Sequence, residues 1–247
     1  MGKKVEIIQF KELNANKRID EDFLSYSSDR NDNTEDNHFI DLVNPSPLFL
    51  FSYPIIKGFA LESMHTLDHG AFGRAITGLA YEKKEGKLDV NSLRKVDHRI
   101  KLFAKCKPYE FERKLRILSS NAKQYKHHEQ RDMLLYYLFP VFKGILSKEK
   151  LENVLLLQYF KLLMGGFEPK PVPEADLVEA RRVSRLYNQQ QMDSKIPIRP
   201  MTHAIIHMPM TVKTFKSSLK VYVPTFLKIL CVSSETYLLL ATCHLNN

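Results

Sequence analysis

One stretch of the sequence, residues 58–72, places acidic and imidazole side chains where an apolar run passes into a helix. Apolar residues recur every three or four positions from residue 64 to residue 79, which puts them on one face of a helix. The short apolar runs at 48–53 and 59–61 predict two strands ahead of it. Glu62 therefore follows directly on a predicted strand, a place where sheet-containing folds commonly hold functional residues.

Three glycines, Gly70, Gly73 and Gly78, lie within this helical pattern. Each weakens a helix by about 1 kcal/mol relative to alanine. Their presence predicts close packing or a bend at this part of the helix.

The rest of the chain is dominated by helical patterns. Asn91 is a plausible N-cap, Pro140 is expected to kink or divide the helix that contains it, and Ser147 is expected to begin another. Leu177, Ala180, Val183 and Leu186 form the expected buried stripe of a charged helix. We therefore predict a predominantly α protein with a few short strands, with further helices at about 91–105, 109–118, 129–146, 147–164 and 174–191.

Composition divides the chain into four regions. Residues 1–44 are acidic and rich in Asn and Ser, which predicts partial disorder. Residues 45–90 hold the predicted strands and the first helix, and residues 91–209 are helical. Residues 210–247 form an apolar tail, in which Pro224, Lys228 and Glu235 argue against a membrane span.

Charge is unevenly distributed along the chain. The net charge is +9, and residues 20–41 carry −7, so the remaining residues carry +16. A basic body favours polyanions such as nucleic acid, although a well-solvated surface explains the charge equally well. The three cysteines form no CxxC pair and the N-terminus is no secretory signal, so we expect an intracellular protein in a reducing compartment.

Two histidine pairs have the spacing of metal ligands. His65 and His69 are four residues apart, as are His203 and His207, and the four rings would make a zinc site if the pairs converged. Glu62 is a candidate Mg²⁺ ligand at the predicted strand end. The alternative for all five residues is an ordinary role, as helix-capping acid or partly buried imidazole.

Several segments, taken in order, resemble one protein family. Residues 58–65 are similar to a segment of eukaryotic DDE-type, RNase H-like transposase-like proteins derived from DNA transposons. Further similar segments follow in the family's order, at residues 125–131, 134–137, 140–146 and 200–209. The resemblance covers roughly residues 45–209 and excludes the tail.

The resemblance implies a fragment of an RNase H-like core (residues 45–90) interrupted by a helical insertion (residues 91–209). In such proteins three acids bind two Mg²⁺ ions for DNA strand cleavage and transfer. Glu62 falls where the family usually has Asp, and neither of the other two acids maps onto this chain. We therefore expect a catalytically incomplete fragment that is not an active enzyme and retains some DNA binding, in the nucleus or cytoplasm.

Three alternatives stay open from the sequence. The chain could be a domesticated helical module that binds a protein partner, the four-histidine zinc protein described above, or an expressed relic. No small-molecule cofactor is expected, and no particular residues are singled out for DNA contact.

Overall fold

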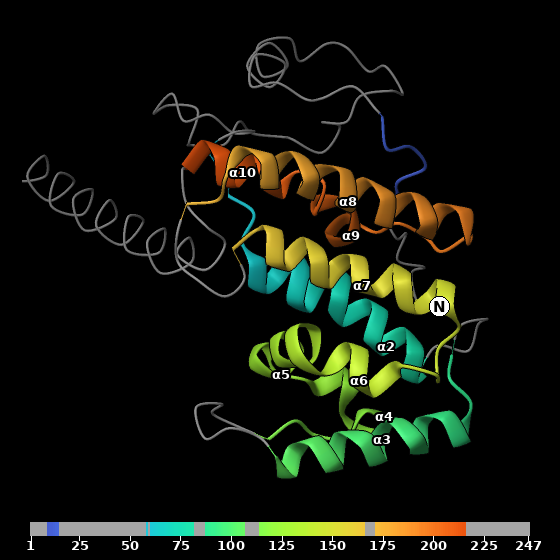
Figure 1. Ribbon diagram of the computed structural model, residues 1–247. Helices are drawn as coiled ribbons and strands as arrows, with labels where there is room; N and C mark the ends of the chain where they lie inside the picture. Colours follow the sequence, from blue (N-terminus) through green and yellow to red (C-terminus); the bar gives the residue numbers. More distant parts are fainter. Residues whose placement is uncertain are drawn as a thin grey trace, which may run out of the picture. The chain divides into compact units, whose positions relative to one another are not determined.

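The computed structural model describes residues 9–14, 58, 60–81, 87–106, 114–165 and 171–215, and these are predominantly helical, as predicted (Figure 1). The chain divides into two compact units, one of Met1–Leu13 with Glu62–Asn247 and one of Asn14–Leu61. Every described helix belongs to the first unit. The predicted strand at 48–53 lies outside the described residues.

The described helices differ in type. Two of them, η2 and η4, are π-helices, and η3 is a 3₁₀-helix. In chain order they are η2 (Met64–Phe72), α2 (Gly73–Tyr81), α3 (Val90–Lys105), α4 (Leu118–Asn121), η3 (Ala122–Gln124), α5 (His127–Asp132), η4 (Met133–Tyr137), α6 (Leu138–Phe142), α7 (Lys148–Leu163), α8 (Glu174–Asp193), α9 (Pro200–Ala204) and α10 (Met208–Phe215).

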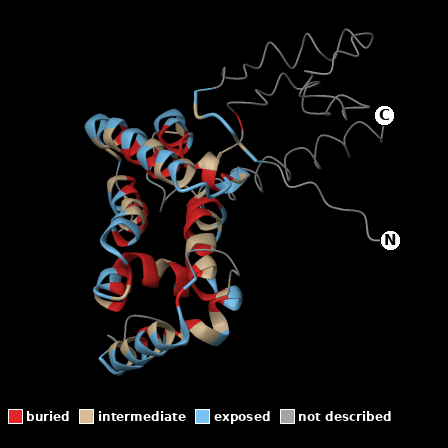
Figure 2. Cartoon of the chain, turned by 90° about the vertical axis from the view of Figure 1, so that its right-hand side faces the viewer, coloured by how far each residue is buried: buried red, intermediate tan, exposed pale blue. Residues whose placement is uncertain are grey.

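Within the first unit the helices lie in layers (Figure 1). Helices α8, α9 and α10 form one end, α7 and α2 come next, then α5 and α6, and α3 with α4 form the other end. The π-helix η2 packs against α5, α7 and α9, and its Leu67 and Phe72 are fully buried. Buried residues line the sides of the helices that face this interior (Figure 2).

The structure corrects the predicted strand at 59–61. Ala60 and Leu61 form no strand, and they lead directly into the turn that begins η2. Among the described residues, β-pairing is limited to an isolated antiparallel bridge in which the Phe10 N–H donates to the Ile198 carbonyl at 2.9 Å. A strand needs a neighbour to accept its hydrogen bonds, and among the residues that the structure describes Ala60 and Leu61 have no such neighbour.

Helix starts follow the capping chemistry of the sequence. Asp89, rather than the predicted Asn91, caps α3, and its Oδ1 accepts the N–H of Asn91 at 2.8 Å and of Ser92 at 3.0 Å. Ser147 caps α7 as predicted, with its Oγ accepting the Lys150 N–H at 3.3 Å. An aspartate and a serine both satisfy backbone donors that a helix leaves unpaired at its first turn.

Asp97 caps a helix other than its own, and this leads to a prediction. From α3 its Oδ1 accepts the N–H groups of Leu118 (2.8 Å) and Ser119 (3.2 Å), and its Oδ2 accepts the Ser119 hydroxyl at 2.5 Å. We expect Asp97→Ala to lower the free energy of unfolding by about 1–2 kcal/mol, because α4 loses its cap. Urea denaturation measures this loss, and Asp97→Asn, which keeps one acceptor oxygen, should lose less. An alanine variant as stable as wild type would show that α4 does not need this cap.

The final described helix, α10, lies partly in the region predicted as a tail. It runs from Met208 to Phe215, packs against α8 and buries Met208 and Val212. The rest of the region, residues 216–247, lies outside the described residues. None of the helices in the described ranges is long and apolar enough to span a membrane.

Candidate functional site

Glu62 stands at the start of η2 and caps it. Its Oε2 accepts the Met64 N–H at 2.7 Å, and its Oε1 accepts the His65 N–H at 2.5 Å. The Nδ1 atom of the His65 ring also contacts Oε1. Both oxygens of the predicted metal ligand are therefore engaged by the first turn of the helix.

Asp68, one turn further along η2, is the centre of a buried polar cluster. Its side chain is 0% exposed, and both carboxylate oxygens accept hydrogen bonds from Lys161 Nζ of α7, at 2.9 and 2.8 Å. Lys161 Nζ also donates to Ser63 Oγ at 2.5 Å. His127 of α5 places Nε2 2.9 Å from Asp68 Oδ2. The cluster joins three helices through one buried carboxylate.

The charges in this cluster compensate one another. Burial by itself raises the pKa of Asp68, but the positive charge of Lys161 and the hydrogen bonds from His127 and Lys161 outweigh it, so the pKa lies below its ordinary value. Asp68 is thus ionised at neutral pH and held by Lys161. This geometry suits a fixed ion pair better than a group that exchanges protons.

Three imidazoles lie in a row beside Asp68. The ring centroids of His65 and His69 are 6.2 Å apart, and those of His69 and His127 are also 6.2 Å apart. Burial, followed by repulsion from the His127 and His65 rings, lowers the pKa of His69. The row is therefore largely uncharged at its centre near neutral pH.

The second predicted pair, His203 and His207, lies at α9 and the turn that follows it. Their Nε2 atoms are 3.2 Å apart. In the part of the chain that the structure describes, no three His, Cys, Asp or Glu residues are grouped so that they could hold a metal ion. The two histidine pairs therefore do not meet in one four-ligand site.

The described residues also do not fit a two-metal magnesium site. Such a site needs several carboxylate oxygens free to face the ions. The oxygens of Glu62 cap a helix, and Asp68 is enclosed by Lys161.

Sequence reasoning missed Lys161, the residue that neutralises Asp68. Lys161 is on the same face of α7 as the buried residues Val154, Leu157 and Met164, at spacings of three and four. A charged residue on an apolar helix face is rarely buried unless it is paired. The position of Lys161 on the apolar face of its helix was therefore the sign in the sequence that this lysine is buried and paired.

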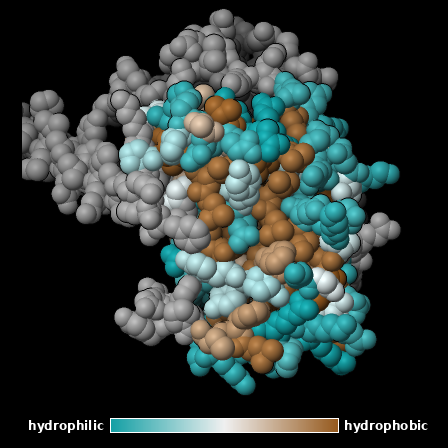
Figure 3. Space-filling model, viewed as in Figure 1, coloured by the Kyte–Doolittle hydropathy of each residue, from teal (hydrophilic) through white to brown (hydrophobic). Residues whose placement is uncertain are grey.

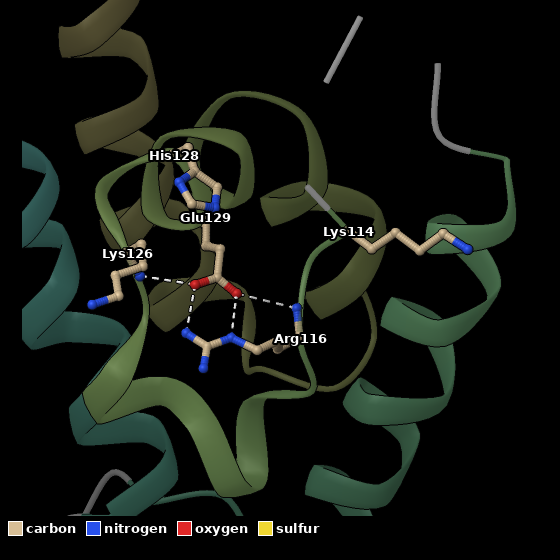
Figure 4. Close-up of a pocket in the computed structure, with 5 residues that line it drawn as sticks. All are labelled: Lys114, Arg116, Lys126, His128 and Glu129. Atoms are coloured by element: carbon tan, nitrogen blue, oxygen red, sulfur yellow. Dashed lines mark hydrogen bonds and ion pairs between the residues drawn. The ribbon is translucent and has the colours of Figure 1, made fainter. Parts of the chain in front are cut away.

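A separate basic pocket of about 210 Å³ is lined by Lys114, Arg116, Lys126, His128 and Glu129 (Figure 4). Arg116 donates two hydrogen bonds to the Glu129 carboxylate, from Nε to Oε1 at 2.8 Å and from Nη2 to Oε2 at 2.6 Å. The Lys126 N–H donates to Oε2 at 2.8 Å. Figure 4 shows the Lys114 side chain extending away from Glu129.

The single carboxylate of this pocket is fully engaged. Burial raises the pKa of Glu129, but the hydrogen bonds from Arg116 and the Lys126 N–H outweigh burial and lower the pKa overall. Glu129 is therefore an ionised partner for the Arg116 guanidinium.

Comparisons with protein-family models, with curated proteins and with solved structures each find no match to this chain.

Proposed function

We propose that the helical body binds the phosphate backbone of a nucleic acid through the basic rim of the pocket, defined as Lys114, Lys126 and His128. The charge balance of the pocket carries this proposal. Glu129 neutralises Arg116, whereas the ammonium groups of Lys114 and Lys126 have no acidic partner among the described residues. Unpaired ammonium groups that contact phosphates release counterions, the main source of sequence-independent affinity.

The floor of the pocket supports the proposal, because side-chain hydrogen bonds fix the backbone there. Arg116 Nη2 donates to the Gln124 carbonyl at 2.6 Å, and the Tyr125 hydroxyl donates to the Arg116 carbonyl. Tyr125 is itself buried. The rim side chains therefore project from a fixed frame, which limits the ordering cost of binding.

A transposase ancestry, with an RNase H-like core and a helical insertion, is part of the same proposal. The order of the resembling segments supports this ancestry, and so does the packing of helices from three of these segments against one another. Helix η2 follows the first segment and packs against α5 from the second and α9 from the last. Because Glu62 is a helix cap here, we propose binding without strand cleavage.

The experiment is a salt series of fluorescence anisotropy with a labelled 20-base-pair duplex. We expect wild type to bind, and Lys114→Gln/Lys126→Gln to bind more weakly. Each lost phosphate contact reduces the slope of log K against log salt by about 0.9, so the double variant should lose about 1.8.

The matched control is Lys148→Gln/Lys150→Gln, which removes the same charge from exposed residues at the start of α7. This variant should keep the wild-type slope. Equal losses in both double variants would mean that net charge, and not the rim, governs binding. No binding of wild type at 50 mM salt would reject the proposal.

A second candidate function, a protein-interaction module, is favoured by one observation. Tyr159 and Leu162 of α7 are 44% and 39% exposed. Figure 3 shows apolar side chains gathered over the middle of the face on which α7 lies. Exposed apolar patches of this kind are common at protein interfaces. Leu162→Glu separates the two functions, because it alters this face and leaves the pocket rim intact.

A further inference from the structure

His203 and His207 present two ring nitrogens to the same point. Their Nε2 atoms are 3.2 Å apart, and the ring centroids are 5.1 Å apart. A tetrahedral zinc ion with Zn–N bonds of about 2.0–2.1 Å holds two nitrogens about 3.3–3.4 Å apart. The pair matches that spacing without rearrangement, whereas His65 and His69 have centroids 6.2 Å apart.

The backbone that carries the pair is anchored. The His207 N–H donates to the Ala204 carbonyl at 2.9 Å, and the Ile206 N–H donates to the His203 carbonyl at 3.0 Å. Between the two histidines, Ile205 is fully buried, and Met208 is buried directly after them. The separation of the two rings is therefore set by a packed turn.

The His203 ring is held in place from a distant part of the chain. Phe10 stacks on it with a centroid distance of 4.0 Å and an interplanar angle of 2°. The Nδ1 atom of His203 is buried, without a hydrogen-bond partner among the described residues, so only Nε2 is available to a ligand.

From this geometry we propose that His203 and His207 bind one late first-row divalent cation, such as Zn²⁺ or Cu²⁺, through their Nε2 atoms. The described residues bring no third protein ligand to this point, so water completes the coordination. His203 Nδ1 lacks the acceptor that usually supports a ligating histidine, and such partners change metal affinity by about 10–100-fold. The site is therefore of moderate affinity.

The first test is calorimetric titration of tag-free protein with Zn²⁺. We expect one ion per chain for wild type, and at least about tenfold weaker binding for His207→Gln, in which one imidazole remains. The matched control is His69→Gln, which breaks the other pair of the same spacing and should bind as wild type does. His207 is exposed, and circular dichroism checks that both variants are folded.

The second test identifies the ligand atoms. Cu²⁺ binds the same imidazole ligands as Zn²⁺ with higher affinity, and its electron paramagnetic resonance spectrum shows how many nitrogens coordinate the ion. We expect two imidazole nitrogens in wild type and one in His207→Gln. Retained Zn²⁺ binding in His207→Gln, loss of binding in His69→Gln, or no Zn²⁺ binding by wild type would each overturn the proposal. The last outcome would leave the two rings as a simple hydrogen-bonded pair.

Discussion

Replacing Lys161 by methionine should lower the free energy of unfolding by about 3–5 kcal/mol, because it leaves a buried carboxylate without its cation. Asp68 is 0% exposed and Lys161 is 5% exposed, so water cannot solvate the remaining charge. Methionine has a similar length and no charge, which keeps the packing change small. Urea denaturation, with circular dichroism as the signal, measures the loss.

Two further variants identify the cause of that loss. The double variant Lys161→Met/Asp68→Asn removes both charges and should recover much of the stability, as a double-mutant cycle would reveal. Arg182→Met breaks an exposed pair with Glu179 on α8 and should leave stability unchanged. A loss below about 1 kcal/mol for Lys161→Met would mean that the pair is not effectively buried.

Gly70→Ala should destabilise the protein, although alanine stabilises an ordinary helix interior by about 1 kcal/mol relative to glycine. A Cβ atom at residue 70 would lie 2.6 Å from the His65 backbone oxygen and 2.9 Å from Met201 Cβ. Both distances are below van der Waals contact, so η2 or α9 must shift. Overpacking of this kind costs about 1–3 kcal/mol.

Thermal and urea denaturation of Gly70→Ala test the sign of the effect. Lys101→Ala, at an exposed position within α3, controls for helix propensity and should be close to neutral. A Gly70→Ala variant more stable than wild type would mean that residues 64–72 form an ordinary α-helix, without the close approach at His65.

Much of the helical fold could be predicted, because periodicity reports which face of a helix is buried. The pattern at 64–79 predicted a helix that the structure contains as η2 and α2. Its glycines predicted close packing, which Gly70 and Gly73 confirm. The π geometry could not be predicted from the periodicity, and neither could the packing of η2 against α9, which lies far away in the sequence.

Local rules held at Pro140 and only in part for α8. Pro140 was expected to kink or divide the helix that contains it, and the structure divides residues 127–142 into α5, the π-helix η4 and α6, with Pro140 as the third residue of α6. Leu186 was expected in the buried stripe of α8 and is 36% exposed. Leu177, Ala180 and Val183 of that stripe are buried as predicted.

The candidate site was harder to predict than the fold. An acid next to a helix start can cap the helix or bind a cation, and the sequence does not separate these roles for Glu62. The pairing of Asp68 with Lys161 joins residues 93 positions apart, so no local pattern reveals it. The spacing of four residues singled out two histidine pairs, but it did not reveal that the His203 and His207 rings lie closer together than those of His65 and His69.

The contact between η2 and α9 also determines when the chain can complete its fold during synthesis. About 130 residues separate these two elements, and ribosomes need on the order of ten seconds to add them. Phe10 must remain without its partners for longer still, because Ile198 and His203 are synthesised about 190 residues later. Helices α5 and α7 can cover their parts of η2 earlier, but the part of η2 that packs against α9 stays uncovered on the nascent chain until α9 emerges, and chaperone binding is expected in that interval.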